Sequence, residues 1–525
     1  RSPPPPPHHA HIVNDPVFAE LERDMEPAAA RGFLALATDY LAATRTSAGP
    51  VSSGLTFAEL AERFDEPLPV AGRPVEEILA RLERDVIRDS NRLMHPMAMG
   101  HQVSPPLPAA IWTEPLIAAL NQSVAVLEMS PTGTPLELRV VRWMCDVAGL
   151  GPGSGGTLTS GGTEATFTAL LAARTAVLPD AWRMGVGSDP PVVVCGEHAH
   201  YAIARAIGEL GLGVDRAVVI PSRDFRMDTS ALAERLASLH RAGTRVMAVV
   251  ATAGSTAMGS FDDLETIAGV CEERDIWLHV DGAHGASALF SAGHRHRLRG
   301  IERARSIAWD PHKMMLMPLS AGMLLVRDER DLERAFSQSA PYLFHATGDD
   351  AASDVSGGIA MADGDPIDPK LRQSAPDQGV RSFLCSRRVD ALKLWVCLQR
   401  YGSDGFSAIY NTLCDTTLAL YTQISATTLF EAVHEPECNI LCFRYVGRGG
   451  REVPDAELDR LNRELRERYN RSGGGWITTT LLGGRRVLRV TVMNPRTTAA
   501  HTAALLDGLA EVGATLIAEF RRAPG

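Results

Sequence analysis

The stretch IWLHVDGAHGAS, residues 276–287, begins as an apolar run and ends in a turn of small residues around Asp281. Short, fully apolar strands separated by amphipathic helices are typical of a mostly parallel sheet that is buried on both faces. The sequence therefore predicts an α/β fold with helices on both sides of a central sheet. Its further strands are expected at PVVVC (191–195), AVVI (217–220), VMAVVA (246–251), SIAWD (306–310) and GMLLV (322–326).

The rest of the chain is divided by composition and periodicity. Residues 1–15 are rich in proline and histidine and are expected to form a disordered tail. Residues 16–104 are predicted to be a helical segment, and residues 105–400 to be the large domain, with a mobile loop at about 340–380. Residues 401–525 are predicted to form a small α/β domain. Within these parts, helices are expected at 74–90, 386–402 and 500–521, and strands near 439–445 and 486–493.

The composition excludes several classes of protein. The chain has 525 residues, 45% of them hydrophobic, and 52 basic against 63 acidic side chains give a net charge of −11. This balance is that of a globular protein, and it argues against partners such as nucleic acid or a membrane surface, which require a basic face. The sequence contains no run of 18 uncharged apolar residues, so it predicts no membrane-spanning helix. Eight scattered cysteines without a CxxC pair, and no signal-peptide pattern, favour free thiols, no metal site and a cytoplasmic location.

A turn of small residues, Ser160-Gly161-Gly162-Thr163, opens a long predicted helix. The free N–H groups and the positive end of the helix dipole make such a turn suitable for binding an anion. The simpler interpretation of the same residues is an ordinary helix cap. On this segment alone, both interpretations stand.

Four more chemically capable side chains lie at or just after the ends of predicted strands. Asp281 ends one strand, Lys313 follows SIAWD in a segment with little other charge, and His198 and His200 follow PVVVC. Each alone could be an ordinary surface residue. The carboxyl ends of parallel strands meet at one edge of a sheet, however, which would bring these residues together. An amine, an anion site and a carboxylate in one place meet the requirements of pyridoxal phosphate, whose ring withdraws electrons from a substrate carbanion.

The motifs TSGGTEA (159–165), HAHY (198–201), HVDGAHG (279–285) and DPHK (310–313) resemble, in this order, those of the group II pyridoxal-phosphate-dependent amino-acid decarboxylases. The resemblance extends over roughly residues 75–525. It implies the type I fold of pyridoxal-phosphate-dependent transferases, which is aspartate aminotransferase-like. It also implies an enzyme that converts an L-amino acid to the corresponding amine and CO2.

The resemblance also implies roles for individual residues around the cofactor. Lys313 would hold pyridoxal phosphate covalently, and Asp281 would keep its pyridine nitrogen protonated. His200 and Ala283 would lie against opposite faces of the ring. The other cofactor contacts implied in this way are Gly162, Thr163, Thr256 and His312.

The family delivers the final proton from a tyrosine on a mobile loop, which implies Tyr342 in APYLFH (340–345) as the general acid, with His200 as the second candidate. Neighbouring Phe344 leaves the register open, and with it an aldehyde synthase, since synthases of this family carry phenylalanine at that position. The motifs are also compatible with another pyridoxal-phosphate-dependent lyase, an aromatic-amino-acid decarboxylase or an inactive scaffold relative.

The substrate pocket is suggested by weaker similarities. HQVS (101–104) is similar to NQLS of the glutamate enzymes, which implies Gln102 and Ser104 as substrate contacts. Arg489 matches an arginine that meets a substrate carboxylate, although a structural ion pair explains the residue equally well. The expected substrate is a small acidic or polar amino acid of the glutamate, aspartate or diaminobutyrate type. At Gly282 and His284, many relatives carry Ala and Tyr or Trp.

The family's members are homodimers with active sites at the subunit interface. The resemblance therefore implies a homodimer in which the amino-terminal helices of residues 16–104 contact the partner.

Overall fold

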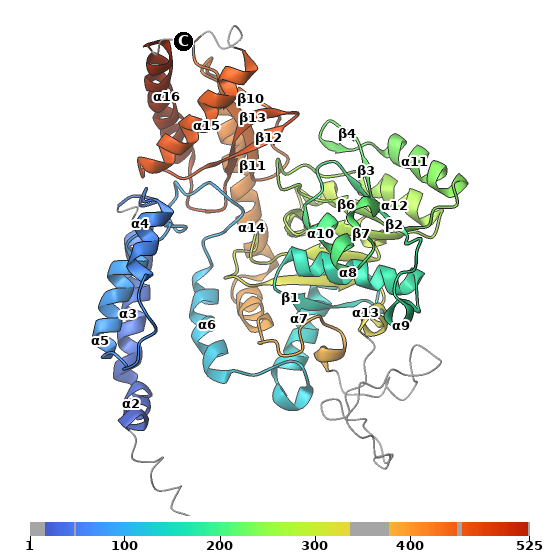
Figure 1. The fold of residues 1–525 in the computed structure, drawn as a ribbon, viewed down its shortest axis with the longest axis horizontal. Helices are drawn as coiled ribbons and strands as arrows, with labels where there is room; N and C mark the ends of the chain where they lie inside the picture. Colours follow the sequence, from blue (N-terminus) through green and yellow to red (C-terminus); the bar gives the residue numbers. More distant parts are fainter. Residues whose placement is uncertain (1–15, 47–48, 337–376, 449–453, 523–525) are drawn as a thin grey trace, which may run out of the picture.

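The computed structural model describes residues 16–46, 49–336, 377–448 and 454–522 (Figure 1). The predicted tail and nearly all of the predicted mobile loop, including Tyr342, lie outside these residues. Figure 1 shows a central α/β body, a smaller sheet with long helices beside it, and an arm of amino-terminal helices along one side.

A seven-stranded sheet forms the centre of the body, in the order β1-β9-β8-β7-β6-β2-β3. All six predicted apolar runs are strands of this sheet, and it is mostly parallel, as the sequence predicts. The strands are β1 (Gly155–Thr159), β2 (Val192–Gly196), β3 (Ala217–Ile220), β6 (Val246–Thr252), β7 (Trp277–Asp281), β8 (Ser306–Trp309) and β9 (Gly322–Val326).

Helices cover both faces of this sheet, which explains why its strands are apolar throughout. On β2, Val193 packs in one cluster with side chains of α8 (Gly162–Val177) and α10 (Ala202–Glu209). The next residue, Val194, packs in another cluster with side chains of α11 (Thr229–Arg241) and α12 (Leu264–Glu272). Successive residues of a strand point to opposite faces, so burial on both sides requires the unbroken apolar runs seen in the sequence.

Two features of the sheet depart from a simple parallel pattern. Strand β9 is antiparallel to both β8 and β1; the connection from β8 to β9, residues 310–321, contains no helix, whereas a parallel return usually crosses over through one. Strand β1 is not among the predicted strands, since its sequence GGTLT is rich in glycine and threonine. A Cβ at Gly156 would lie 2.2 Å from the carbonyl oxygen of Leu324. The close approach of β1 to β9 therefore requires glycine at position 156, and this glycine makes β1 difficult to recognise as a strand from the sequence.

The carboxyl-terminal part holds an antiparallel sheet in the order β10-β11-β13-β12, with α15 (Asp455–Arg471) and α16 (Ala499–Arg522) beside it. The predicted strands correspond to β11 (Ile440–Tyr445) and β13 (Arg485–Thr491), whereas the shorter β10 (Phe430–Ala432) and β12 (Thr478–Leu482) were not predicted.

The long helix α14 (Ala391–Ser425) connects the body to the small sheet, and its backbone leaves the helical conformation at Gly402. The predicted domain boundary at residue 400 falls beside this kink. The remaining helices include α2 (Pro16–Asp24), α3 (Pro27–Arg45), α4 (Phe57–Ala61), α5 (Val75–Arg81), α6 (Pro108–Leu120), α7 (Gly133–Val147), α9 (Ala181–Met184) and α13 (Arg330–Ala335). Within the described ranges, no helix combines the length and the apolar character that crossing a membrane requires.

A buried ion pair joins α7 to the segment that leads into α14. Arg387 donates from both terminal nitrogens to the carboxylate of Glu137, at 2.8 and 2.5 Å, and both side chains are almost fully buried. Removing one member of a buried pair leaves the other charge without compensation. We expect Glu137→Ala to lower the free energy of unfolding by about 3–5 kcal/mol, measured by denaturant titration. Glu519→Ala, which removes the exposed Arg468–Glu519 pair, is the control and is expected to leave the free energy of unfolding almost unchanged, because solvent screens exposed ion pairs.

Candidate active site

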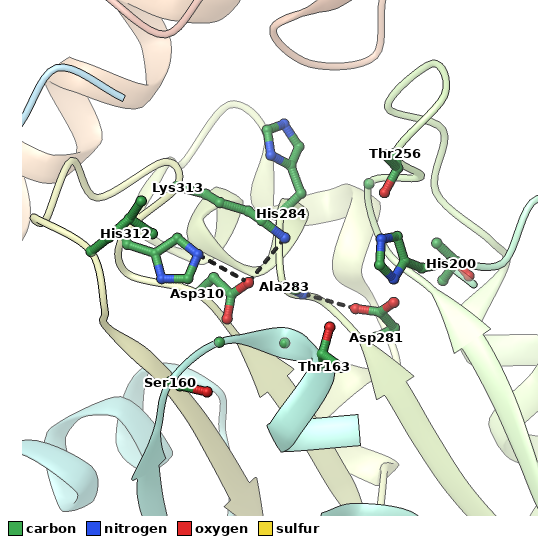
Figure 2. A pocket seen from close by; sticks show the side chains of 15 residues that line it. Ser160, Thr163, His200, Thr256, Asp281, Ala283, His284, Asp310, His312 and Lys313 are labelled. Atoms are coloured by element: carbon green, nitrogen blue, oxygen red, sulfur yellow. Dashed lines mark hydrogen bonds and ion pairs between the residues drawn. The ribbon is translucent and has the colours of Figure 1, made fainter. Parts of the chain in front are cut away.

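A cavity of about 340 Å³ lies at the edge of the central sheet where β1, β2, β6, β7 and β8 end (Figure 2). This edge is where open α/β sheets bind ligands. All eight residues predicted to contact the cofactor line the cavity, and their elements come from five separate parts of the sequence. The lining residues are Ser160, Gly161, Gly162, Thr163, His200, Thr252, Gly254, Thr256, Asp281, Ala283, His284, Asp310, His312, Lys313 and Leu319.

The amino terminus of α8 forms one wall of the cavity. Among the described residues, no side chain caps this helix end with a hydrogen bond, so its first N–H groups are available to an anion in the cavity that Gly162 and Thr163 line. Its glycines are needed for close packing. A Cβ on Gly162 would lie 2.8 Å from the Cβ of Ala283, and a Cβ on Gly322 would lie 2.5 Å from the Cα of Gly161.

Lys313 lies in the turn after β8 and extends into the cavity, where its Nζ is 2.9 Å from Oδ2 of Asp310. The sequence suggested surroundings with little other charge for this lysine, and the structure shows instead a buried carboxylate as its partner. The same oxygen lies 3.5 Å from Nε2 of His312. The backbone N–H of Ala321 donates to Nδ1 of His312, so a neutral His312 ring carries its proton on Nε2. That nitrogen can donate a hydrogen bond to an anion in the cavity.

Asp281 ends β7, with its carboxylate at the cavity, and its Oδ1 accepts a hydrogen bond of 3.2 Å from the N–H of Ala283. His200 lines the cavity as well, and its Nδ1 accepts from the N–H of Ala202. Burial lowers the pKa of the His200 imidazole below its ordinary value, even though Asp281 acts in the opposite direction. His200 therefore presents a neutral ring with its proton on Nε2.

The loop that carries Thr256 is fixed by hydrogen bonds at both ends. Gly254 N–H donates to the carbonyl of Ser260, and Asp262 accepts from the N–H groups of Met227 and Thr252 at 2.7 and 2.8 Å. Burial raises the pKa of the Asp262 carboxyl, while these two hydrogen bonds act against the shift. Asp262 thus orients the end of β6.

The predicted substrate contacts do not line the cavity. Ser104 donates to the backbone carbonyl of His312 at 2.8 Å, so it supports the turn that carries Lys313. Arg489, on β13, donates from Nε to the carbonyl of Ala257, and its Nη2 has no partner among the described residues. The amide nitrogen of Gln102 is likewise buried without a partner in that part of the chain. The predicted general acid, Tyr342, lies outside the described residues.

Some lining residues were not singled out from the sequence: Thr252, Gly254, Asp310 and Leu319. Asp310 was quoted only within SIAWD and DPHK and was given no role of its own. Its position as the last residue of the run SIAWD, like that of Asp281 after IWLHV, was a usable signal. Leu319 gave no such signal, because nothing in its neighbourhood distinguishes it from a core leucine.

These residues fit pyridoxal phosphate. The cofactor needs an amine, an anion site and a carboxylate, and the cavity offers Lys313, the uncapped start of α8 and Asp281. Within the described residues, Asp310 Oδ1 and Thr252 Oγ1 are buried polar atoms that lack a hydrogen-bond partner. Unsatisfied buried groups of this kind around a cavity are expected where a polar ligand completes them.

Comparisons with known proteins agree with this chemistry. The family described as "Pyridoxal-dependent decarboxylase conserved domain" matches residues 59–361 and 369–446. The chain is 33% identical over 489 residues to an L-2,4-diaminobutyrate decarboxylase of Rhizobium meliloti (strain 1021), covering 93% of this chain and 92% of the relative. It is 32% identical over 467 residues to the cysteine sulfinic acid decarboxylase of Homo sapiens, covering 87% and 90%.

The fold is also shared with a solved structure of this kind. The crystal structure of mouse CSAD superposes with a TM-score of 0.83 at 29% identity, covering 95% of this chain and 99% of that one. The expected type I fold of pyridoxal-phosphate-dependent enzymes is thereby confirmed.

The packing at α8 predicts a substitution that weakens cofactor binding. We expect Gly162→Ala to weaken the binding of pyridoxal phosphate by about tenfold or more, because the new Cβ pushes against Ala283 and shifts the start of α8. The measurement is titration of the apoenzyme with the cofactor, followed by absorbance. The control is Gly151→Ala, where a Cβ would meet nothing within 4 Å. Equal affinities of wild type and Gly162→Ala would show that this contact does not shape the anion site.

Proposed function

The chain belongs to the pyridoxal-dependent decarboxylase family, and on this premise we propose that it decarboxylates a small amino acid with an acidic or polar side chain. Decarboxylation with pyridoxal phosphate follows from the family. The substrate class is the proposal. It is supported by the short side chains of 2,4-diaminobutyrate and cysteine sulfinate, the amino acids named for two of the relatives.

The observation that carries the assignment is the position of Lys313. The sequence contains three lysines, of which Lys313 and Lys393 lie in the described ranges. Lys393 is fully buried and held by Glu114 and Asp390 at 2.7 and 3.0 Å. Lys313 alone of these two reaches the cavity, so we propose it as the residue that binds the cofactor's aldehyde group.

The remaining cofactor contacts are assigned from the cavity wall. When bound, pyridoxal phosphate supplies a ring that accepts the electron pair left at the substrate Cα after CO2 departs. Asp281 would hold a proton on the ring nitrogen, since a carboxylate favours the charged form of a group beside it. The N–H groups at Gly162 and Thr163, together with Nε2–H of His312, would hold the phosphate.

The ring itself would lie between His200 and Ala283, with Thr256 near its edge. A flat, neutral imidazole can stack on an aromatic ring without adding charge to it, and the small side chain of Ala283 leaves room on the other face. We assign proton delivery at Cα to Tyr342, by its motif, with Nε2–H of His200 as the second candidate donor.

Lys313→Ala is expected to reduce kcat by several orders of magnitude, because no other described lysine reaches the cavity to form the covalent link. The measurement is CO2 release from a panel of L-amino acids, including glutamate, aspartate, cysteine sulfinate, 2,4-diaminobutyrate, tyrosine and DOPA. Arg223→Ala, at an exposed position on the hairpin strand β4 (Ser222–Arg223), is the control and should keep wild-type rates. Near-wild-type turnover by Lys313→Ala would exclude Lys313 as the attachment site. Aldehyde and hydrogen peroxide in place of amine would identify an aldehyde synthase.

We further propose that the chain forms a homodimer through its amino-terminal arm. Helices α2, α3 and α5 bury almost nothing within one chain: Thr44 is the sole fully buried side chain among them. Large apolar side chains such as Phe18, Leu21 and Phe33 remain exposed. Helices in proteins gain most of their stability from packing an apolar face. A second copy of the chain is the partner that the family resemblance suggests for this face.

Wild-type protein is expected to have twice the chain mass of 56.5 kDa in size-exclusion chromatography with light scattering. Phe33→Asp should shift the mass towards that of one chain, because it places a charge in an apolar interface. Met184→Asp, at an exposed position on α9 away from the arm, should not change the mass. A monomeric wild-type protein would exclude this dimer.

A further inference from the structure

Asp310 lines the cavity, and the proposed function gives it no role towards the cofactor. The residue is 1% exposed, and Figure 2 shows its side chain between Lys313 and the turn before α8. Its Oδ2 is 2.9 Å from Nζ of Lys313, and a Cβ on Gly162 would lie 3.1 Å from the same oxygen. A carboxylate oxygen therefore lies at the helix start that is proposed to hold the phosphate.

The carboxylate of Asp310 depends on Lys313 as its ion-pair partner. Oδ1 is buried without a partner among the described residues. Oδ2 is 3.5 Å from Nε2 of His312, which is too long for a strong hydrogen bond. The nitrogen of Lys313 is also the one proposed to bond to the cofactor's aldehyde carbon, so loading the cofactor ends the pairing of a free ammonium with Asp310. A buried carboxylate then needs another hydrogen-bond donor.

The cavity carries more carboxylates than cations. Its lining includes two carboxylates, Asp281 and Asp310, and a single amine, that of Lys313. The three histidines that line it add no charge, because burial lowers the pKa values of all of them: His200, His284 and His312. The lining is therefore negative before a phosphate enters it.

Charged groups behind the cavity wall do not reverse this balance. The carboxylate of Glu164, in the first turn of α8, accepts from the N–H of Ser160 at 2.8 Å and adds a negative charge beside the helix start. The cations Arg387 and Lys393 interact electrostatically with Glu164 and His312, but each is already ion-paired with a buried or half-buried carboxylate. A doubly charged phosphate would thus be opposed by carboxylates and compensated by N–H groups alone.

We propose that the cavity binds the cofactor's phosphate in its singly charged form, whose P–OH group donates a hydrogen bond to Oδ2 of Asp310. The inference rests on the proposed function. Phosphate monoesters ordinarily lose their second proton at about pH 6, and a like charge nearby disfavours that loss. A carboxyl group is ordinarily the stronger acid, so the shared proton stays on the phosphate. The new bond replaces the ion pair with Lys313, and it makes Asp310 a residue that distinguishes anions with a proton from anions without one.

Inorganic anions test this selection without cofactor or turnover. Phosphate carries a proton at neutral pH, whereas sulfate has the same shape and carries none. We expect calorimetric titration of the apoenzyme to give an affinity for phosphate at least about tenfold higher than for sulfate, the effect of one hydrogen bond to a charged group. Asp310→Asn, whose amide can donate to either anion, should bind the two about equally. Glu164→Gln is the matched control: it removes a charge beside the same helix start and should keep the wild-type preference.

Phosphorus NMR of the holoenzyme reports the charge of the bound phosphate directly. The resonance of free pyridoxal phosphate moves between two positions as the pH passes about 6. In the wild-type holoenzyme we expect it to stay at the position of the singly charged form up to about pH 8, because the site opposes the second charge. In Asp310→Asn it should lie at the position of the doubly charged form at the same pH.

Two results would overturn the proposal and leave decarboxylation intact. One is a doubly charged phosphate in the wild-type holoenzyme at neutral pH, and the other is equal affinity of the wild-type apoenzyme for phosphate and sulfate. Neither requires Asp310→Asn to fold. Failure of the protein to take up pyridoxal phosphate, or to release CO2 from any amino acid, would instead refute the proposed function, and the anion titration would still decide the role of Asp310.

Discussion

The cavity depends on three backbone segments that approach one another with nothing larger than one methyl group at their contacts. The turn before α8 touches the start of β9 at Gly161 and Gly322, and it touches the turn after β7 at Gly162 and Ala283. Because these contacts are made by glycines and one alanine, the helix end, the Asp281 turn and the Lys313 turn converge around one small space. A larger side chain at any of these contacts would separate groups that must act on the same ligand. The chemistry of the site thus depends on this close approach of the backbone segments.

Charge in the cavity consists of one opposed pair and one further carboxylate among neutral imidazole rings. Lys313 faces Asp310, Asp281 lies at the end of the neighbouring strand, and the imidazoles of His200 and His312 both have pKa values lowered by burial. Because these imidazole rings are neutral, they can stack on the cofactor or donate hydrogen bonds to it. They do not compete with its phosphate for the anion site or with its pyridine nitrogen for a carboxylate. A buried carboxylate beside the lysine also holds the amine inside the cavity, since an isolated charge there would be costly.

The sequence predicted the strands of the central sheet and the residues that meet at the cavity, for a shared physical reason. Buried parallel strands must be apolar throughout, so the runs IWLHV and SIAWD can be recognised as strands from the sequence. The polar residues that end them fall at the same edge of the sheet. Residues whose role depends on distant partners were not predictable in this way. Ser104 looked like a substrate contact, and the structure shows it bonded to the His312 carbonyl. Strand β1 was concealed by the glycines that let it approach β9, and nothing local to His284 indicated which nitrogen would carry its proton.

The protonation of His284 links the central body to the small carboxyl-terminal sheet. The tautomer of His284 is set by Asn439, at the start of β11, whose Oδ1 accepts from Nε2 at 2.7 Å, and Asn439 is in turn oriented by Val492 beyond the end of β13. The small sheet, which contributes no lining residue to the cavity, therefore determines whether the cavity presents a donor or an acceptor at that position. Asn439 and Val492 are joined by a second bond, from the N–H of Val492 to the backbone carbonyl of Asn439, so the amide sits on a rigid support. A change in the small sheet can therefore alter the polarity of the cavity at His284 without changing any other residue that lines it.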